Sequence, residues 1–334
     1  MIRAVGGLGC LAVAGVVASG SACWKGVPAD AGLGEPIQVS GGQFVAGPMP
    51  GSPPAPLSGL GADDAGTDGG TPGLSPLSVT SVIFVNSTIV SGIGGTSVSG
   101  LATDDAVAIG VQLASLGTGY WVVPMQGQDA QFPGQSDFGF TLGFNPSDAP
   151  GQTDLRVVAV GSNGAAGQQV EAPVCIESRV PDNGHACISK HVVPQAVFTL
   201  TWNADFDVDL HVITPGGFDV NPKTLVTSQP YDGGLPVPQT LGYIDRDSIG
   251  NCVIDDWREE DLIFQDAPPT GNYLVYAAPF ASCGQEAVTF TFTIYEPGSD
   301  GNLHSTFTRS GELLASDATG GASTGLFVAE KTFN

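Results

Sequence analysis

The sequence predicts an all-β protein in which two β-sandwich domains follow a disordered linker. The chain contains 48 Gly and 25 Pro among 334 residues, a composition typical of short strands joined by many turns. Long helix-forming runs are few, whereas short runs of β-branched and aromatic residues alternate with a period of two, the period of a half-buried strand.

The N-terminus has the features of an export signal. Met1-Ile-Arg precedes an apolar run from residue 4 to 17, and small residues then lead to Cys23. This run is too short to span a bilayer, so residues 1–22 are predicted to be a signal peptide. Gly20-Ser-Ala-Cys23 resembles a bacterial lipobox, although Gly20 stands where a larger apolar residue is usual. The resemblance implies that Cys23 is lipidated and anchors the chain in a membrane; ordinary cleavage after Ala22 is the alternative.

The segment after the signal is expected to be a disordered tether over residues 23–77. Residues 24–77 alone contain 13 Gly and 9 Pro. Such a segment cannot bury enough apolar surface to offset the conformational entropy lost on folding.

Residues 78–175 are expected to form the first sandwich. Turn signals such as Pro133-Gly134 and Asn145-Pro146 separate its strands. The strands are predicted within residues 79–90, 106–113, 120–123, 138–144 and 155–160. Residues 149–164 resemble the last strands of a bacterial immunoglobulin-like or fibronectin-like module.

A connector over residues 176–194 and a second sandwich over residues 195–334 complete the predicted organisation. Val288, Phe290, Phe292 and Ile294 share one face of a strongly alternating strand. Further strands are predicted over residues 196–202, 271–277 and 325–333. We expect this domain to be C2-like or jelly-roll-like.

The cysteines predict two disulfides. Cys10 leaves with the signal and Cys23 would carry lipid, which leaves an even number for an exported, oxidising environment. Four cysteines allow three pairings. A zinc site is the alternative, but the sequence has no Cys-x-x-Cys pair. We expect the local pairings, Cys175 with Cys187 and Cys252 with Cys283.

One strand of the second domain carries a row of acids. Asp205, Asp207, Asp209 and His211 alternate with apolar residues, so acids two residues apart have Cα atoms roughly 6.6 Å apart on one face. At an effective dielectric of about 20, two such carboxylates about 5 Å apart repel by roughly 3 kcal/mol. The row therefore predicts a bound hard cation, most plausibly Ca²⁺. A solvated face with its acids splayed apart is the alternative.

A second acidic segment resembles a calcium loop. Asp245, Asp247 and Asn251 are spaced in a turn that contains Gly250, and short oxygen ligands with a turn-permitting Gly are the logic of such loops. The final Glu of an EF-hand is missing, so the turn would supply half a site. The other reading is a turn whose acids bond backbone N–H groups or pair with nearby arginines. The predicted Ca²⁺ ligands are Asp207, Asp209, Asp245 and Asp247.

Charge and motifs exclude several functions. The chain has 10 Lys+Arg against 33 Asp+Glu, a formal net charge of −23, which argues against nucleic acid as a partner. No nucleophile elbow, P-loop, metalloprotease or dinucleotide-binding motif is present. The sequence therefore predicts a protein that is not an enzyme.

Residues 195–297 resemble a known domain of bacterial exported proteins. Leu200-Thr-Trp, Asp207-Val-Asp-Leu-His-Val, Thr214-Pro-Gly, Asp245-Arg-Asp and Pro268-Pro-Thr-Gly-Asn-Tyr-Leu-Val occur in an order similar to that of the YfaP-like β-sandwich group. The resemblance implies a surface protein or lipoprotein. We expect a lipid-anchored cell-envelope protein at the outer membrane or cell surface, otherwise periplasmic or secreted. It would act as a binding or structural module for a glycan or surface protein; a glycosidase-type hydrolase or a carbohydrate-binding accessory protein is the alternative.

Overall fold

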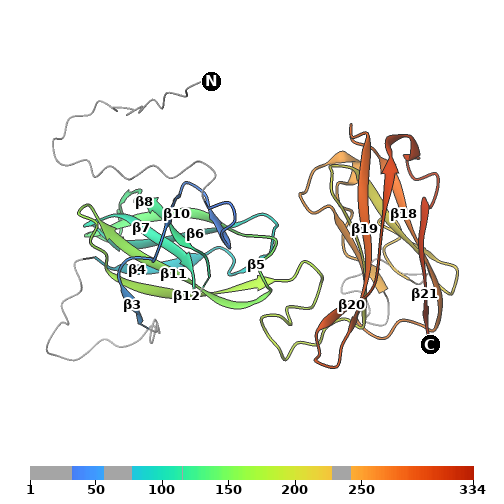
Figure 1. Cartoon of the computed structure of the whole chain (residues 1–334), viewed down its shortest axis with the longest axis horizontal. Helices are drawn as coiled ribbons and strands as arrows, with labels where there is room; N and C mark the ends of the chain where they lie inside the picture. The colour runs from blue at the N-terminus through green and yellow to red at the C-terminus, as the bar shows by residue number, and fades with distance from the viewer. Residues whose placement is uncertain (1–31, 56–76, 115, 228–241) are drawn as a thin grey trace, which may run out of the picture.

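The computed structural model describes residues 32–55, 77–114, 116–227 and 242–334. The predicted signal peptide and Cys23 lie outside this part of the chain. The described residues form two groups of β-sheets joined by a connector (Figure 1), which confirms the all-β, sandwich fold class. No helix among the described residues is long and apolar enough to cross a membrane.

The first sandwich packs a sheet of five strands against a sheet of seven. The smaller sheet has the order β1 (Ile37–Val39), β10 (Gln135–Phe144), β6 (Thr96–Thr103), β4 (Val79–Phe84), with β9 (Gly127–Gln128) on β10. The larger has the order β2 (Gln43–Ala46), β8 (Gly119–Pro124), β7 (Ala106–Leu113), β11 (Gly151–Gly161), β12 (Gln168–Glu177), β3 (Ser52–Ala55), with β5 (Thr88–Val90) on β12. Alternate residues of facing strands, such as Phe138 and Leu142 of β10 and Ile109 and Val111 of β7, form one buried core.

The expected tether is wrong for residues 32–55, which carry three strands of this sandwich. Ile37 of β1 is 2% exposed and pairs with Phe144 at the edge of the smaller sheet. The indole N–H of Trp121 donates to the carbonyl of Ile37 at 3.0 Å. A Gly- and Pro-rich segment can be ordered in this way because each of its short strands pairs with a longer strand in a sheet that the rest of the domain forms. The remainder of the predicted tether, residues 23–31 and 56–76, lies outside the described residues.

The connector between the sandwiches is fastened at both ends. Cys187 is disulfide-bonded to Cys175 of β12, with Cα atoms 5.8 Å apart. On the other side, an Nη2–H of Arg179 donates to the carbonyl of Trp257 at 2.6 Å. The amide of Asn183 exchanges hydrogen bonds with that of Gln265. Disulfide and polar contacts together fix the course of the connector.

The second sandwich packs a five-stranded sheet on a four-stranded sheet. The first has the order β16 (Gly242–Ile244), β17 (Glu259–Phe264), β13 (Ala196–Trp202), β19 (Ala287–Pro297), β20 (Leu303–Leu314). The second has the order β15 (Asp219–Val220), β14 (Asp207–Ile213), β18 (Gly271–Ala281), β21 (Leu326–Phe333). The predicted pairing of Cys252 with Cys283 is confirmed, as is that of Cys175 with Cys187.

Aromatic rings form the centre of the second core. Phe198 of β13 is fully buried and contacts four rings from strands of both sheets. These are Phe264, Phe292, Tyr273 and Phe333, with centroids 5.9–6.1 Å from that of Phe198. The predicted apolar face of β19 is also buried, from Val288 to Ile294. Rings from both sheets thus join the two layers that carry the acidic strand.

We predict that Phe198→Ala lowers the free energy of unfolding of the second sandwich by about 3–5 kcal/mol, the usual cost of emptying a buried aromatic site. Urea denaturation measures this loss as a lower midpoint concentration, with the slope of the unfolding free energy against urea concentration unchanged. Val253→Ala is the control, because Val253 is 69% exposed and exposed substitutions change stability by about 0.5 kcal/mol or less. Equal effects of the two variants would contradict the core described above.

Candidate metal centre

Strand β14 brings two carboxylates into the interior. Asp207 is 1% and Asp209 3% exposed, so the acid-bearing side of the strand is not the solvated face that was the alternative reading. The main chain of the strand pairs with β18 from Asp207↔Ala281 to Ile213↔Leu274. The register shifts at the step from Asp207 to Val208, where Phe280 of β18 is the extra residue. Because the extra residue is on β18, strand β14 continues without interruption and the side chains of Asp207 and Asp209 lie on the same face.

A loop from the other sheet supplies a third carboxylate. Asp247 follows β16 and is exposed. One oxygen each of Asp207, Asp209 and Asp247 lies within 4.8 Å of the other two. The disulfide from Cys252 to Cys283, with Cα atoms 5.4 Å apart, ties this loop to the end of β18, the strand beside β14. The three carboxylates therefore converge from two sheets.

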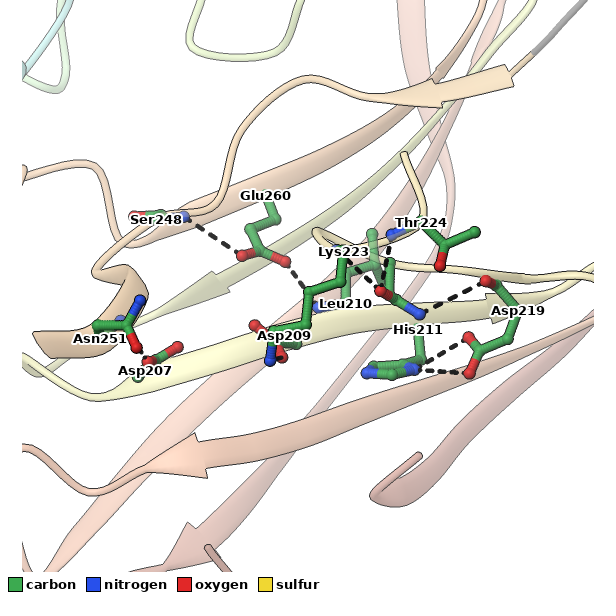
Figure 2. Close-up of polar contacts among 11 residues, drawn as sticks. Asp207, Asp209, Leu210, His211, Asp219, Lys223, Thr224, Ser248, Asn251 and Glu260 are labelled. Atoms are coloured by element: carbon green, nitrogen blue, oxygen red, sulfur yellow. Dashed lines mark hydrogen bonds and ion pairs between the residues drawn. The ribbon is translucent and has the colours of Figure 1, made fainter. Parts of the chain in front are cut away.

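The described residues give these acids few positive or hydrogen-bonding partners. The backbone N–H of Asn251 donates to Oδ2 of Asp207 at 2.8 Å. Asp209 receives no hydrogen bond from the described part of the chain, and its neighbour of opposite charge there is Lys223, with Nζ 3.9 Å from Oδ2 (Figure 2). The same ammonium lies 3.5 Å from the ring centroid of Phe280. One distant lysine thus faces three carboxylates.

Burial and mutual repulsion shift the acids toward protonation. Desolvation, reinforced by the charge of Asp247, raises the pKa of Asp207 to about 6. Desolvation, reinforced by the charge of Asp207, raises the pKa of Asp209 to about 7. A positive ion among the three carboxylates would oppose both effects.

Glu260 of β17 lies directly beside this group and was missed as a site residue. It is fully buried; its Oε2 accepts the N–H of Leu210 at 2.7 Å and its Oε1 that of Ser248 at 3.3 Å (Figure 2). It thereby joins the edge of β14 to the loop that carries Asp247. Desolvation, with the nearby charges of Asp209 and Asp247, raises its pKa well above the usual value.

The structure does not bring Asp245 into the group, which corrects the four-residue prediction. Its Oδ1 accepts the N–H of Asp261 at 3.0 Å, and its Oδ2 accepts from Nε of Arg246 at 2.7 Å. These two bonds hold Asp245 beside β17. At this position the alternative reading, a backbone-bonded and arginine-paired acid, is the correct one.

The other members of the acidic row have separate partners. Asp205 precedes β14, and its Oδ1 accepts from Nε and Nη2 of Arg258 at 2.9 and 2.6 Å. Nδ1 of His211 lies 2.9 and 3.0 Å from the two carboxylate oxygens of Asp219 on β15. Asp219 and Lys223 were not singled out in the sequence, because each is isolated among neutral residues.

Gly250 has a steric role in the loop. It was expected to allow a sharp turn, but the left-handed backbone occurs at its neighbours Ile249 (φ 59°) and Asn251 (φ 55°). A Cβ at Gly250 would instead collide with Oδ1 of Asp247. Any larger residue at position 250 would therefore displace the Asp247 carboxylate from its present position.

Comparisons with known proteins add little to this geometry. No family model and no curated protein matches the chain. Among solved structures, the fibronectin(III)-like modules of Clostridium thermocellum CbhA are 12% identical, cover 70% of this chain and 94% of their own, and have a TM-score of 0.16. Dimeric latent PorU of Porphyromonas gingivalis is also 12% identical, with 76% and 30% coverage and a TM-score of 0.18. Values this low carry no argument on function, and the YfaP-like resemblance stays a prediction.

We predict that the free energy of unfolding falls as the pH rises from about 4 to about 7 in metal-free buffer. Because folding raises the pKa of Asp207 to about 6 and of Asp209 to about 7 from 3.8, the folded state retains protons that the unfolded chain has released, and ionisation then costs stability. Urea midpoints at several pH values with chelator present measure how the free energy of unfolding changes with pH. Asp209→Asn should make this change smaller.

Asp129→Asn is the matched control for this pH series. Asp129 is half-buried in the first sandwich and its pKa is lowered by backbone N–H donors, so it does not titrate in the same window. A slope that is the same in both variants would show that Asp209 is not responsible for the loss of stability.

Proposed function

We propose that this chain is an exported, lipid-anchored cell-envelope protein that acts as a binding or structural module, and that Ca²⁺ bound by Asp207, Asp209 and Asp247 stabilises its second sandwich. The observation that carries the calcium site is the convergence of three carboxylates within 4.8 Å, two of them buried. Buried charges require a compensating charge, and Lys223 at 3.9 Å supplies only one.

The donor set favours Ca²⁺ over other metals. The group consists of carboxylate oxygens, which suit hard cations, whereas Zn²⁺ sites are rich in Cys and His. Ca²⁺ accepts six to eight oxygen ligands in flexible geometry, whereas Mg²⁺ requires a nearly ideal octahedron. Ligands from a strand and from a loop, one of them exposed, fit the less demanding ion, because carbonyl oxygens and water can complete its shell.

The proposed ion would act as a clamp between the two sheets. Asp207 and Asp209 belong to β14, and Asp247 belongs to the loop that follows β16 in the opposite sheet. Glu260 already bridges the same elements through two backbone N–H groups. Ca²⁺ would add a second bridge and fix the loop. Calcium-stabilised extracellular modules commonly bind the ion at about 10⁻⁴–10⁻³ M.

Export is supported by the sequence and by the covalent structure. Two disulfides are typical of proteins that fold in oxidising compartments, and the N-terminus carries signal-peptide and lipobox-like features. The net charge of −23 makes nucleic acid an unsuitable partner. These observations support an extracytoplasmic module, and we propose a glycan or a surface protein as its partner.

We predict that Ca²⁺ raises the melting temperature of the full chain and that EGTA reverses the shift. At free Ca²⁺ 100 times the dissociation constant, the gain is about 2.7 kcal/mol. Asp209→Asn should abolish the shift, because it removes the central buried ligand. Differential scanning calorimetry with and without Ca²⁺ measures it.

Asp256→Asn is the matched control, since Asp256 is exposed in the same loop and its φ of 64° suits Asn equally well. This variant should keep the full Ca²⁺ response. The absence of any Ca²⁺-dependent shift in the unchanged chain, or an equal loss in both variants, would remove the calcium site from the proposal.

We predict that Cys23→Ala releases the protein from the membrane fraction, because the substitution removes the thiol that would carry lipid. Fractionation of expressing bacterial cells, with labelling by a radioactive fatty acid, measures anchoring. Cys10→Ala is the control, since Cys10 would leave with the signal. Recovery of the unchanged protein without lipid in the soluble fraction would favour ordinary cleavage after Ala22.

A further inference from the structure

Among the residues that the structure describes, strand β20 is an uncovered edge of the second sandwich. It is the last strand of its sheet and, within those residues, pairs on one side only, with β19. With 12 residues it is the longest strand of the described chain, and most of its side chains are exposed. Its outer edge therefore presents a long row of backbone N–H and C=O groups to a strand of another molecule.

The other edge strands at the ends of the sheets in the described residues are shorter than β20. Short length limits pairing at an edge, and a bulge or charge opposes it. Five of these edge strands have two to four residues: β1, β2, β3, β15 and β16. Strands β4 and β21 have six and eight residues. Each has a register shift in its pairing, as β20 does. The middle of β20, Thr306-Phe-Thr-Arg-Ser-Gly311, contains one charged residue and no Pro.

An apolar rim accompanies this edge. Nη1 of Arg309 on β20 donates to the carbonyl of Val328 on β21 at 2.6 Å, which places the edges of the two sheets on the same side of the sandwich. Phe307 is 36% exposed, and Leu326 and Phe327 are each 47% exposed. Two stacked strand edges with exposed aromatic and aliphatic side chains form a surface suited to another β-sandwich.

The sequence of β20 allows it to pair with a copy of itself in a register that keeps its arginines apart. A bulge at Thr306, opposite the step from Ile294 to Tyr295, leaves residues 307–314 regular. In an antiparallel pair of β20 strands related by a two-fold axis perpendicular to the sheet, residues that lie opposite each other point to the same face of the sheet. An axis at Arg309 would place two guanidinium groups opposite each other, which is unfavourable. An axis at Ser310 instead places Arg309 opposite Gly311 and Thr308 opposite Glu312, each pair occurring twice.

We propose that β20 is a homodimer interface, in which a second copy of this chain adds its own β20 antiparallel in the register centred on Ser310. The two five-stranded sheets become one continuous sheet of ten strands, and the interface is isologous, the same patch on both copies. Because each chain carries a net charge of −23, the copies repel at low salt. Association therefore strengthens as ionic strength rises and screens this repulsion.

Disulfide trapping tests the register directly. The full chain with Cys10→Ser and Cys23→Ser leaves an introduced cysteine as the one thiol outside the two native disulfides. In the proposed dimer Ser310→Cys lies opposite its own copy, at a Cα separation of about 4.5–5.5 Å, within disulfide range. Thr289→Cys, exposed on the neighbouring strand β19, lies about 20 Å from its copy, because the two positions are three strand spacings apart across the sheet and four residues apart along it. Ser310→Cys should form a covalent dimer and Thr289→Cys should not.

Sedimentation measures the association without cross-linking. The unchanged chain should sediment as a dimer at about 100 µM in 0.5 M NaCl, a concentration suited to interfaces of micromolar affinity. Ser310→Asp should weaken the dimer at least about tenfold, since it places two carboxylates face to face. Ser99→Asp makes the same substitution on exposed β6 of the first sandwich and should have no effect.

Melting temperatures near that of the unchanged chain confirm that each variant is folded. A monomer at this concentration, a Thr289→Cys dimer that forms as readily as the Ser310→Cys dimer, or equal weakening by the two Asp variants would overturn the proposal. A β20 edge that binds an extended peptide of another protein would leave the isolated chain monomeric, so the same measurement separates that partner from a second copy.

Discussion

The structure of the second sandwich depends on the cost of burying like charges close together. Asp207 and Asp209 are almost completely removed from solvent on adjacent same-face positions of one strand, and Glu260 is buried beside them. Several features around them reduce this cost, whereas the carboxylate of Asp247 adds to it. Backbone N–H groups reach Asp207 and Glu260, Lys223 faces Asp209, and the disulfide at Cys252 fixes the loop that supplies some of these donors.

Much of the fold could be predicted because its strands alternate between core and solvent. In β10 and β19, alternate residues such as Phe140 and Phe292 are buried while most of their neighbours remain partly exposed, and a period of two is legible in such strands. Strand β17 has no such pattern: all six residues are buried, and Glu259, Glu260 and Asp261 make the sequence resemble a solvated loop. Tertiary burial overrides local composition there, as it does in strand β1, where Ile37 and Val39 are buried.

The candidate site was predictable in part for the same reason. The spacing of Asp207 and Asp209 along a strand specifies that their carboxylates share a face, whatever the rest of the fold does. Asp247 and Asp245 are two residues apart in a loop, where no fixed period applies, so only the structure shows that Asp245 turns toward Arg246 and Asp261. Glu260 enters the site from the opposite sheet, and sequence spacing holds no information on that approach.

The stapled connector has a mechanical consequence. In a chain held at its N-terminus and loaded through its second sandwich, tension passes from β12 into the connector. Because Cys175 and Cys187, 12 positions apart, are covalently joined, the residues between them cannot extend under load. Without the disulfide they could add roughly 40 Å to the length of the connector, at about 3.4 Å per extended residue. Pulling therefore acts first on the non-covalent contacts of Arg179 and Asn183. When these contacts break, the connector would bend as a short hinge and would not extend as a long flexible linker.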